Sequence, residues 1–72
     1  MSEDGDELQA RAFLRAKLQS FVDANDDLGT RSAQQFILDA ESETGVTDHQ
    51  KLLFMLLEER EHVGYRGVLF HA

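Results

Sequence analysis

The sequence predicts an all-α fold, a three-helix bundle with a C-terminal segment packed back on it, and three observations support this prediction. Proline is absent, so no residue of this type interrupts a helix. Apolar residues recur every three or four positions, which is typical of helices that bury one face. Single glycines stand between the periodic segments. We expect a disordered acidic N-terminus over residues 1–5 and a single helical domain over residues 6–72.

The first helix is expected from about Asp6 to Ala24. At about 100° per residue its apolar side chains fall on one face, and Lys17 can lay its methylene stem along that face. The residues predicted to line the core are Ala10, Phe13, Leu14, Leu18 and Phe21.

The second helix has clear signals at both ends. Ser32 with Gln35 three residues later forms a capping box, in which each side chain satisfies a free backbone N–H of the first turn. Gly45 is expected to end the helix because glycine adopts the left-handed conformation that commonly follows one. The predicted buried residues are Ala33, Phe36, Ile37 and Ala40.

The third helix is expected to begin after Thr47, which would form a second capping box with Gln50, and to end before Gly64. Its predicted inner face consists of Leu52, Leu53, Leu56, Leu57 and Val63. The stretch "YRGVLFHA" follows, and its residues 68–70 are too apolar for a solvated tail. We expect this stretch to fold back on the bundle as an extended piece or a short turn.

Composition excludes several classes of function. The net charge of −7 disfavours direct binding to nucleic-acid phosphates. The chain contains no cysteine, which excludes disulfides, thiolate catalysis and thiolate zinc sites. It has no apolar run long enough to span a membrane and no signal-peptide pattern, so we expect a cytoplasmic protein. No nucleophile is paired with a base and no glycine-rich phosphate loop is present, so neither an enzyme nor a cofactor is expected.

Residues 23–34, "DANDDLGTRSAQ", resemble an EF-hand calcium loop because Asp23, Asn25 and Asp27 occupy its first, third and fifth places. The sixth place holds Leu28 where the loop needs glycine, and the twelfth holds Gln34 where it needs a bidentate glutamate. We therefore interpret the stretch as a turn between two helices and expect no metal, although a metal-binding helical protein with a degenerate loop of this type remains an alternative.

Two further motifs are weak. Glu59 and His62 have the i, i+3 spacing of di-iron helical bundles, but one chain supplies only one such pair, and both are expected on the polar side of the third helix. A helix-turn-helix interpretation of residues 39–57 fails because the would-be recognition helix is acidic, with Lys51 as the only base near its start.

The sequence "LLFMLL" gives the strongest functional indication. Phe54 and Met55 do not fit the predicted inner face and are expected to point outward among charged residues, as is Leu38 on the second helix. Either the C-terminal segment covers Phe54 or Met55, or these side chains form an interface. The candidate partner-binding residues are Leu38, Phe54, Met55 and Phe70.

The function expected from these observations is a small acidic protein–protein interaction module, an adaptor, inhibitor or regulatory subunit that docks through the third helix and the C-terminal segment. Its expected partner is another protein, for which the acidic surface favours a basic one, and a homodimer would supply similar burial. An alternative from a different class is an acidic mimic of nucleic acid that inhibits a DNA- or RNA-binding protein by presenting carboxylates in place of phosphates.

Overall fold

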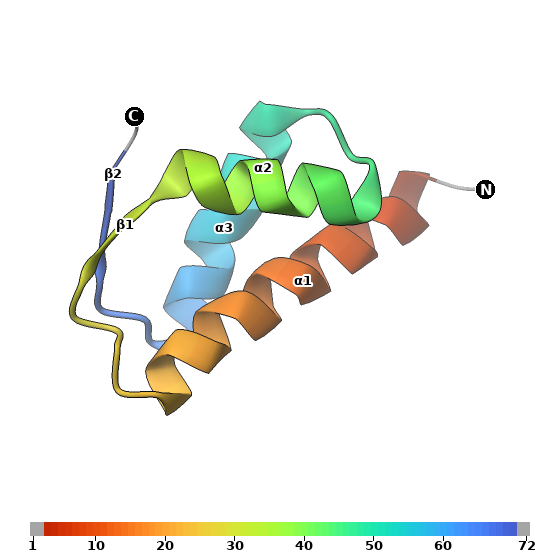
Figure 1. Cartoon of the computed structure of the whole chain (residues 1–72). Coiled ribbons are helices and arrows are strands. Elements are labelled where there is room, and N and C mark those ends of the chain that lie inside the picture. The colour runs from red at the N-terminus through yellow and green to blue at the C-terminus, as the bar shows by residue number, and fades with distance from the viewer. Residues whose placement is uncertain (1–2, 71–72) are drawn as a thin grey trace.

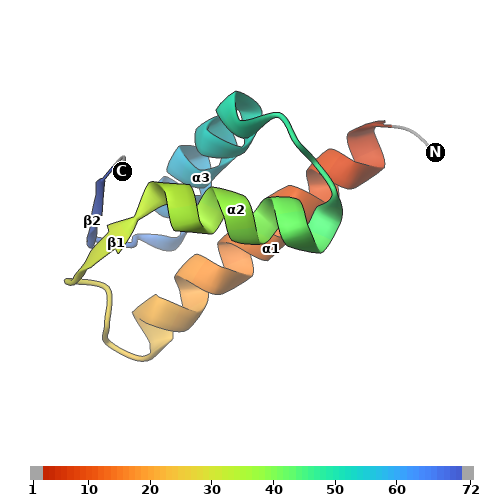
Figure 2. The same ribbon diagram turned by 45° about the horizontal axis from the view of Figure 1, so that its top comes forward.

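A computed structural model describes the backbone of residues 3–70 and the side chains of residues 5–70. It contains three helices that all pack against one another and two short strands, in the order α1, β1, α2, α3, β2 (Figure 1). The all-α fold predicted from the sequence is therefore confirmed. In Figures 1 and 2, α2 lies across the pair formed by α1 and α3, and the strands lie beyond the amino end of α2.

Helix α1 (Glu3–Asp23) begins three residues before the expected start at Asp6. Residues 3–5, expected to be disordered, are therefore helical in this structure, while residues 1–2 of that prediction lie outside the described residues. At the other end Asn25 adopts the left-handed conformation with φ of 59°. The N–H groups of Asn25 and Asp26 donate to the carbonyls of Val22 and Phe21, which is the Schellman arrangement of a helix end.

Helix α2 (Ala33–Thr44) has the predicted ends and the predicted core face. Its N-cap is Ser32, whose side chain accepts a hydrogen bond from the Gln35 backbone N–H at 3.2 Å. Gly45 follows in the left-handed conformation and donates to the Glu41 carbonyl. The residues that this helix buries are the four predicted ones, Ala33, Phe36, Ile37 and Ala40.

Helix α3 (His49–Val63) ends at Gly64 as predicted, but its N-cap is Asp48 and not Thr47. The Asp48 carboxylate accepts a hydrogen bond from the Lys51 backbone N–H at 3.2 Å. Asp48 thus combines the capping bond with a negative charge at the positive end of the helix dipole. Within residues 3–70, no helix combines the length and the apolar character that crossing a bilayer requires.

The C-terminal segment folds back as expected, and it does so as a strand. Strand β2 (Val68–Phe70) pairs in parallel with β1 (Thr30–Ser32), with Thr30 opposite Val68 and Ser32 opposite Phe70. The Val68 N–H donates to the Gly29 carbonyl at 2.9 Å. Both strands contact α2. The two strands therefore lie together at the amino end of α2. They do not cover the outer faces of α1 and α3.

The core lies between the three helices. Its fully buried leucines come from α1 and α3, and α2 adds the aromatic ring of Phe36, which meets Phe21 edge to face at 6.0 Å between ring centres. The buried apolar residues are Ala10, Leu14, Leu18, Ala33, Phe36, Ile37, Ala40, Leu52, Met55, Leu56 and Tyr65. Phe13 and Phe21 of the predicted α1 stripe are only partly buried, at the edge of this core.

Candidate protein-docking surface

The outer face of α3 carries a shallow apolar hollow. Phe54 is 70% exposed, which is far more than a large aromatic side chain of a small protein usually retains. Beside it, Leu57 is exposed and Leu53 is half-buried. The hollow has a volume of about 480 Å³ and is lined by Gln50, Leu53, Phe54, Leu57, Glu58 and Glu61. Phe54 therefore points outward, as the sequence predicts.

The spacing of these lining residues follows the helix. They recur every three or four positions from Gln50 to Glu61, so they form one ridge about three turns long. The apolar side chains lie towards the first half of the ridge, and the acidic residues Glu58 and Glu61 lie towards its end. The surface combines an aromatic anchor with carboxylates on one side, which is an arrangement common at protein interfaces.

The prediction for Met55 is wrong. This side chain is only 3% exposed and belongs to the core, next to Leu52 and Leu56. The buried face of α3 contains positions 52, 55, 56 and 59, so its centre lies about 65° around the helix from the centre of the predicted face. Leu57, which was predicted to be buried, is consequently exposed.

The other two candidate residues are exposed, but they do not join the hollow on α3. Leu38 lies on α2 and Phe70 on β2, and neither lines the hollow. In the described part of the chain, no Cα atom of β2 lies within 8 Å of a Cα atom of α3. The C-terminal strand therefore does not cover Phe54. The exposed candidate residues are therefore divided among α2, α3 and β2.

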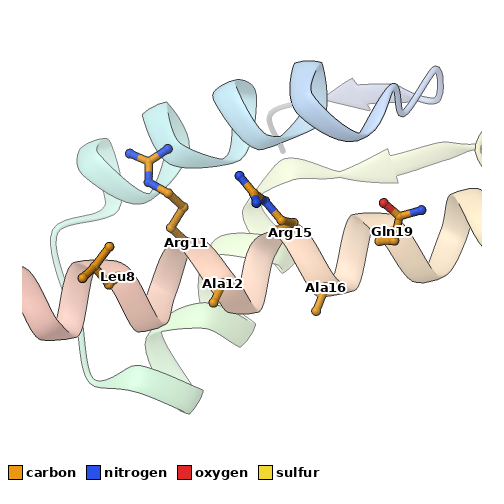
Figure 3. Close-up of a pocket in the computed structure, with 6 residues that line it drawn as sticks. All are labelled: Leu8, Arg11, Ala12, Arg15, Ala16 and Gln19. Atoms are coloured by element: carbon orange, nitrogen blue, oxygen red, sulfur yellow. The ribbon is translucent and has the colours of Figure 1, made fainter.

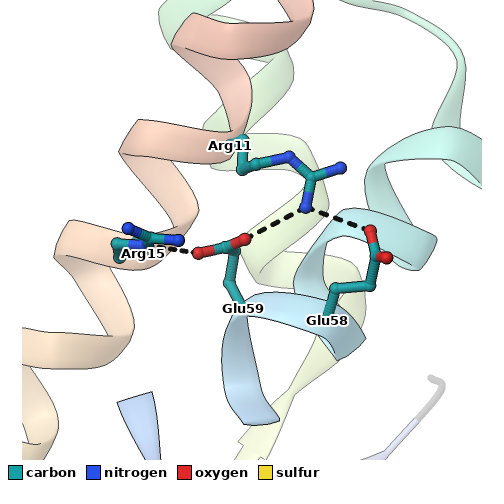
Figure 4. Close-up of polar contacts among 4 residues, drawn as sticks. All are labelled: Arg11, Arg15, Glu58 and Glu59. Carbon is teal, nitrogen blue, oxygen red and sulfur yellow. Dashed lines mark hydrogen bonds and ion pairs between the residues drawn. The ribbon is translucent and has the colours of Figure 1, made fainter. Parts of the chain in front are cut away.

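Glu59 is a fully buried charged residue, and its place differs from the prediction. Its side chain is fully buried at the α1–α3 interface, between Arg11 and Arg15 of α1 (Figure 4). Arg11 Nη1 lies 3.0 Å from Glu59 Oε2 and also 3.0 Å from Glu58 Oε1. Because the two guanidinium groups are partly exposed, they cover the carboxylate from solvent while remaining hydrated themselves.

The protonation of this cluster follows from its contacts. Burial alone raises the pKa of Glu59, but the hydrogen bonds from Arg15 and Arg11 together outweigh burial and hold the pKa below its usual value. The hydrogen bonds that Arg11 donates to Glu59 and Glu58 in turn raise the pKa of Arg11. At neutral pH Glu59 and Arg11 are therefore ionised. His62 is exposed, so Glu59 and His62 do not form the inward-facing metal pair considered from the sequence.

In the stretch that resembles a calcium loop, each of three carboxylates contacts a different residue. Asp23 accepts a hydrogen bond from Gln19, Asp26 pairs with Arg31, and the largely buried Asp27 lies 3.5 Å from Arg66. Within residues 5–70, no three histidine, aspartate or glutamate side chains come together as a metal site would require. This turn therefore ends α1 and anchors the loop before β1.

A second hollow, on the outer face of α1, was not identified from the sequence. It has a volume of about 550 Å³ and is lined by Leu8, Arg11, Ala12, Arg15, Ala16 and Gln19 (Figure 3). In Figure 3, Arg11 and Arg15 reach towards α3, while Ala12 and Ala16 point away from it. The signal in the sequence is the i, i+4, i+8 spacing of Leu8, Ala12 and Ala16, a second apolar stripe on a helix that already has a core stripe.

Comparisons of the chain with protein-family models, with curated proteins and with solved structures find no match. The function is therefore inferred from the surface itself.

Proposed function

We propose that this chain is a small protein-interaction module, an adaptor, inhibitor or regulatory subunit, that docks through the hollow on the outer face of α3. The observation that carries the proposal is the exposure of Phe54 beside Leu57 on a helix whose opposite face is fully packed. Burial of an aromatic side chain in this position would contribute strongly to binding, because a partner that covers it removes a large apolar area from water.

The chemistry of the hollow indicates which kind of partner it would bind. A ridge three turns long with its apolar side chains in helical spacing fits an amphipathic helix that contributes its own apolar side chains every three or four residues. The carboxylates of Glu58 and Glu61 and the net charge of −7 favour a partner whose apolar side chains are flanked by lysine or arginine. Charge would then accelerate association, and burial of Phe54 would supply most of the affinity.

The test compares Phe54→Glu with Leu28→Glu. Leu28, in the turn after α1, is 69% exposed, which matches the 70% of Phe54, and it lines neither the α1 hollow nor the α3 hollow. Both variants are expected to fold, because each adds a charge at an exposed site. Proteins that bind the immobilised wild-type chain in a lysate of its source cells are identified by mass spectrometry, purified and titrated calorimetrically against each variant.

We expect a specific partner to bind wild type and Leu28→Glu equally and to bind Phe54→Glu at least about tenfold more weakly, since a central aromatic anchor contributes about 2 kcal/mol or more. Equal binding of all three proteins would exclude the α3 hollow as the docking site. Binding that survives Phe54→Glu but disappears in high salt would instead support the carboxylate mimic of nucleic acid.

A further inference from the structure

The chain itself carries a surface with the chemistry that the α3 hollow requires. On the outer face of α1, the apolar side chains of Leu8, Ala12 and Ala16 form one stripe, and Arg11 and Arg15 stand beside it (Figure 3). This is an amphipathic helix face with basic residues next to apolar ones. The α3 hollow offers the complement, because it combines the large side chains of Phe54 and Leu57 with two carboxylates.

The two hollows adjoin on one side of the molecule. Arg11 lines the α1 hollow, Glu58 lines the α3 hollow, and these two side chains are joined by the 3.0 Å ion pair between the helices. The apolar residues of α1 and α3 therefore lie on either side of a strip of charged groups. Helix α2 packs across both α1 and α3, and neither α2 nor the two strands contributes a residue to either hollow.

The strip between the hollows is electrically balanced. It contains the cations Arg11 and Arg15 and the anions Glu58 and Glu59, in a chain with a net charge of −7. Two copies of an acidic protein repel each other through most of their surfaces. They repel less where opposite charges are already paired, so this strip does not oppose contact with another copy.

We propose that a second copy of the chain docks on this surface as a two-fold symmetric dimer, which rests on the proposed docking function of the α3 hollow. In a two-fold dimer the same surface of both copies forms the interface, so each contact between two different residues occurs twice. Phe54 of each copy enters the α1 hollow of the other between Leu8 and Ala12. Glu61 of each copy then faces Arg15 of the other. A large aromatic side chain thus meets small alanines, and the Glu61 carboxylate meets the partly exposed guanidinium group of Arg15.

The surface area that a stable dimer must bury is a small fraction of the exposed surface of this chain. A dimer of ordinary size buries about 800 Å² on each partner, which is roughly a sixth of the 4575 Å² that the described chain exposes. Twelve residues line the two hollows, and the six apolar ones among them supply the centre of such an interface. A small domain also gains from dimerisation, because the contact adds to a core that is limited by chain length.

The test measures molecular mass by sedimentation equilibrium from about 1 μM to about 1 mM, the range in which weak dimers form. Wild type is compared with Phe54→Glu in the α3 hollow, Ala12→Glu in the α1 hollow and the control Ala24→Glu. Ala24 is exposed after the end of α1 and lines neither hollow. Circular dichroism checks that each variant keeps its helices.

We expect dimers of wild type and of Ala24→Glu, and dissociation constants at least about tenfold larger for both Phe54→Glu and Ala12→Glu. A wild-type chain that is monomeric throughout this range overturns the dimer, and so does an Ala12→Glu variant that dimerises like wild type. Ala12→Glu leaves the α3 hollow intact. If wild type is monomeric and, of the variants, only Phe54→Glu loses binding to the purified partner, the dimer is overturned and the proposed function stands.

Discussion

Gly67 shows how closely single residues fit in this small fold. A Cβ atom at this position would lie 2.2 Å from the Tyr65 hydroxyl oxygen and 2.8 Å from the Gly29 carbonyl oxygen. The Tyr65 ring is buried, and the backbone between Gly29 and Val68 is held by a 2.9 Å hydrogen bond. The close approach of β2 to the loop before β1 therefore depends on the absence of a side chain at Gly67.

We expect Gly67→Ala to lower the free energy of unfolding by about 1–3 kcal/mol, the usual cost of overpacking a tight site. Gly29→Ala is the matched control, because its Cβ would meet only Asp26 Oδ1, at an ordinary 3.9 Å. Thermal and urea unfolding measure both variants. If the two substitutions change stability equally, the contact with Tyr65 is not the constraint that we infer.

The residues of α3 show what a sequence pattern can and cannot specify. The prediction that Phe54 points outward is correct, yet Met55 beside it is buried. The stretch "LLFMLL" offers two apolar faces that differ by a rotation of about 65°, and the pattern alone does not choose between them. The choice is made by Glu59, which shares the buried face because Arg11 and Arg15 neutralise it. These arginines lie on another helix, so no local signal around Glu59 reveals them.

Helix ends were predicted more accurately than buried faces, because capping depends on residues that are neighbours in the chain. Ser32, Gly45 and Gly64 all have their predicted roles. The exceptions are the start of α1, which lies three residues before the expected one, and the start of α3, where Thr47 and Asp48 are both acceptable N-caps by type. The strand pair was not predicted, because residues 30–32 find their partner far along the chain and their pattern is too short to identify a strand.

The start of α3 allows a direct test of capping. We expect Asp48→Ala to lower the free energy of unfolding by about 1 kcal/mol, because the Lys51 N–H loses its acceptor and the helix dipole loses a complementary charge. Thr47→Ala, which removes the cap predicted from the sequence, should change stability by less than about 0.5 kcal/mol. Urea unfolding of both variants decides the question. A larger loss for Thr47→Ala would place the cap one residue earlier.

At the scale of the whole molecule, ion pairs connect the helices in addition to their apolar contacts. Glu59 of α3 joins Arg11 and Arg15 of α1, and Asp39 of α2 pairs with Lys17 of α1. The hydrogen bond from Lys17, followed by that from Gln35, lowers the pKa of Asp39. Both helix–helix contacts made by α1 thus contain a carboxylate that is stabilised in its ionised form.

This arrangement predicts how stability depends on pH. The folded pKa values of Asp39 and Glu59 lie below their unfolded values, which are near 4, so on acidification the unfolded chain binds protons first. The stabilisation is therefore fully present above about pH 5 and declines as the pH falls below about 4.5. Urea unfolding at pH 7, 5, 4 and 3 should show this loss in wild type.

The contribution of Glu59 is isolated by Glu59→Gln, with Glu43→Gln at an exposed position of α2 as the control. Glu59→Gln should be less stable than wild type at pH 7, by about 1.5–3 kcal/mol for the loss of hydrogen bonds to a charged group. Because the substituted side chain no longer titrates, its stability should fall less steeply than that of wild type between pH 5 and 3. Glu43→Gln should follow the wild-type profile. If Glu59→Gln loses as much stability on acidification as wild type does, the cluster with Arg11 and Arg15 does not hold the ionised carboxylate in the folded state.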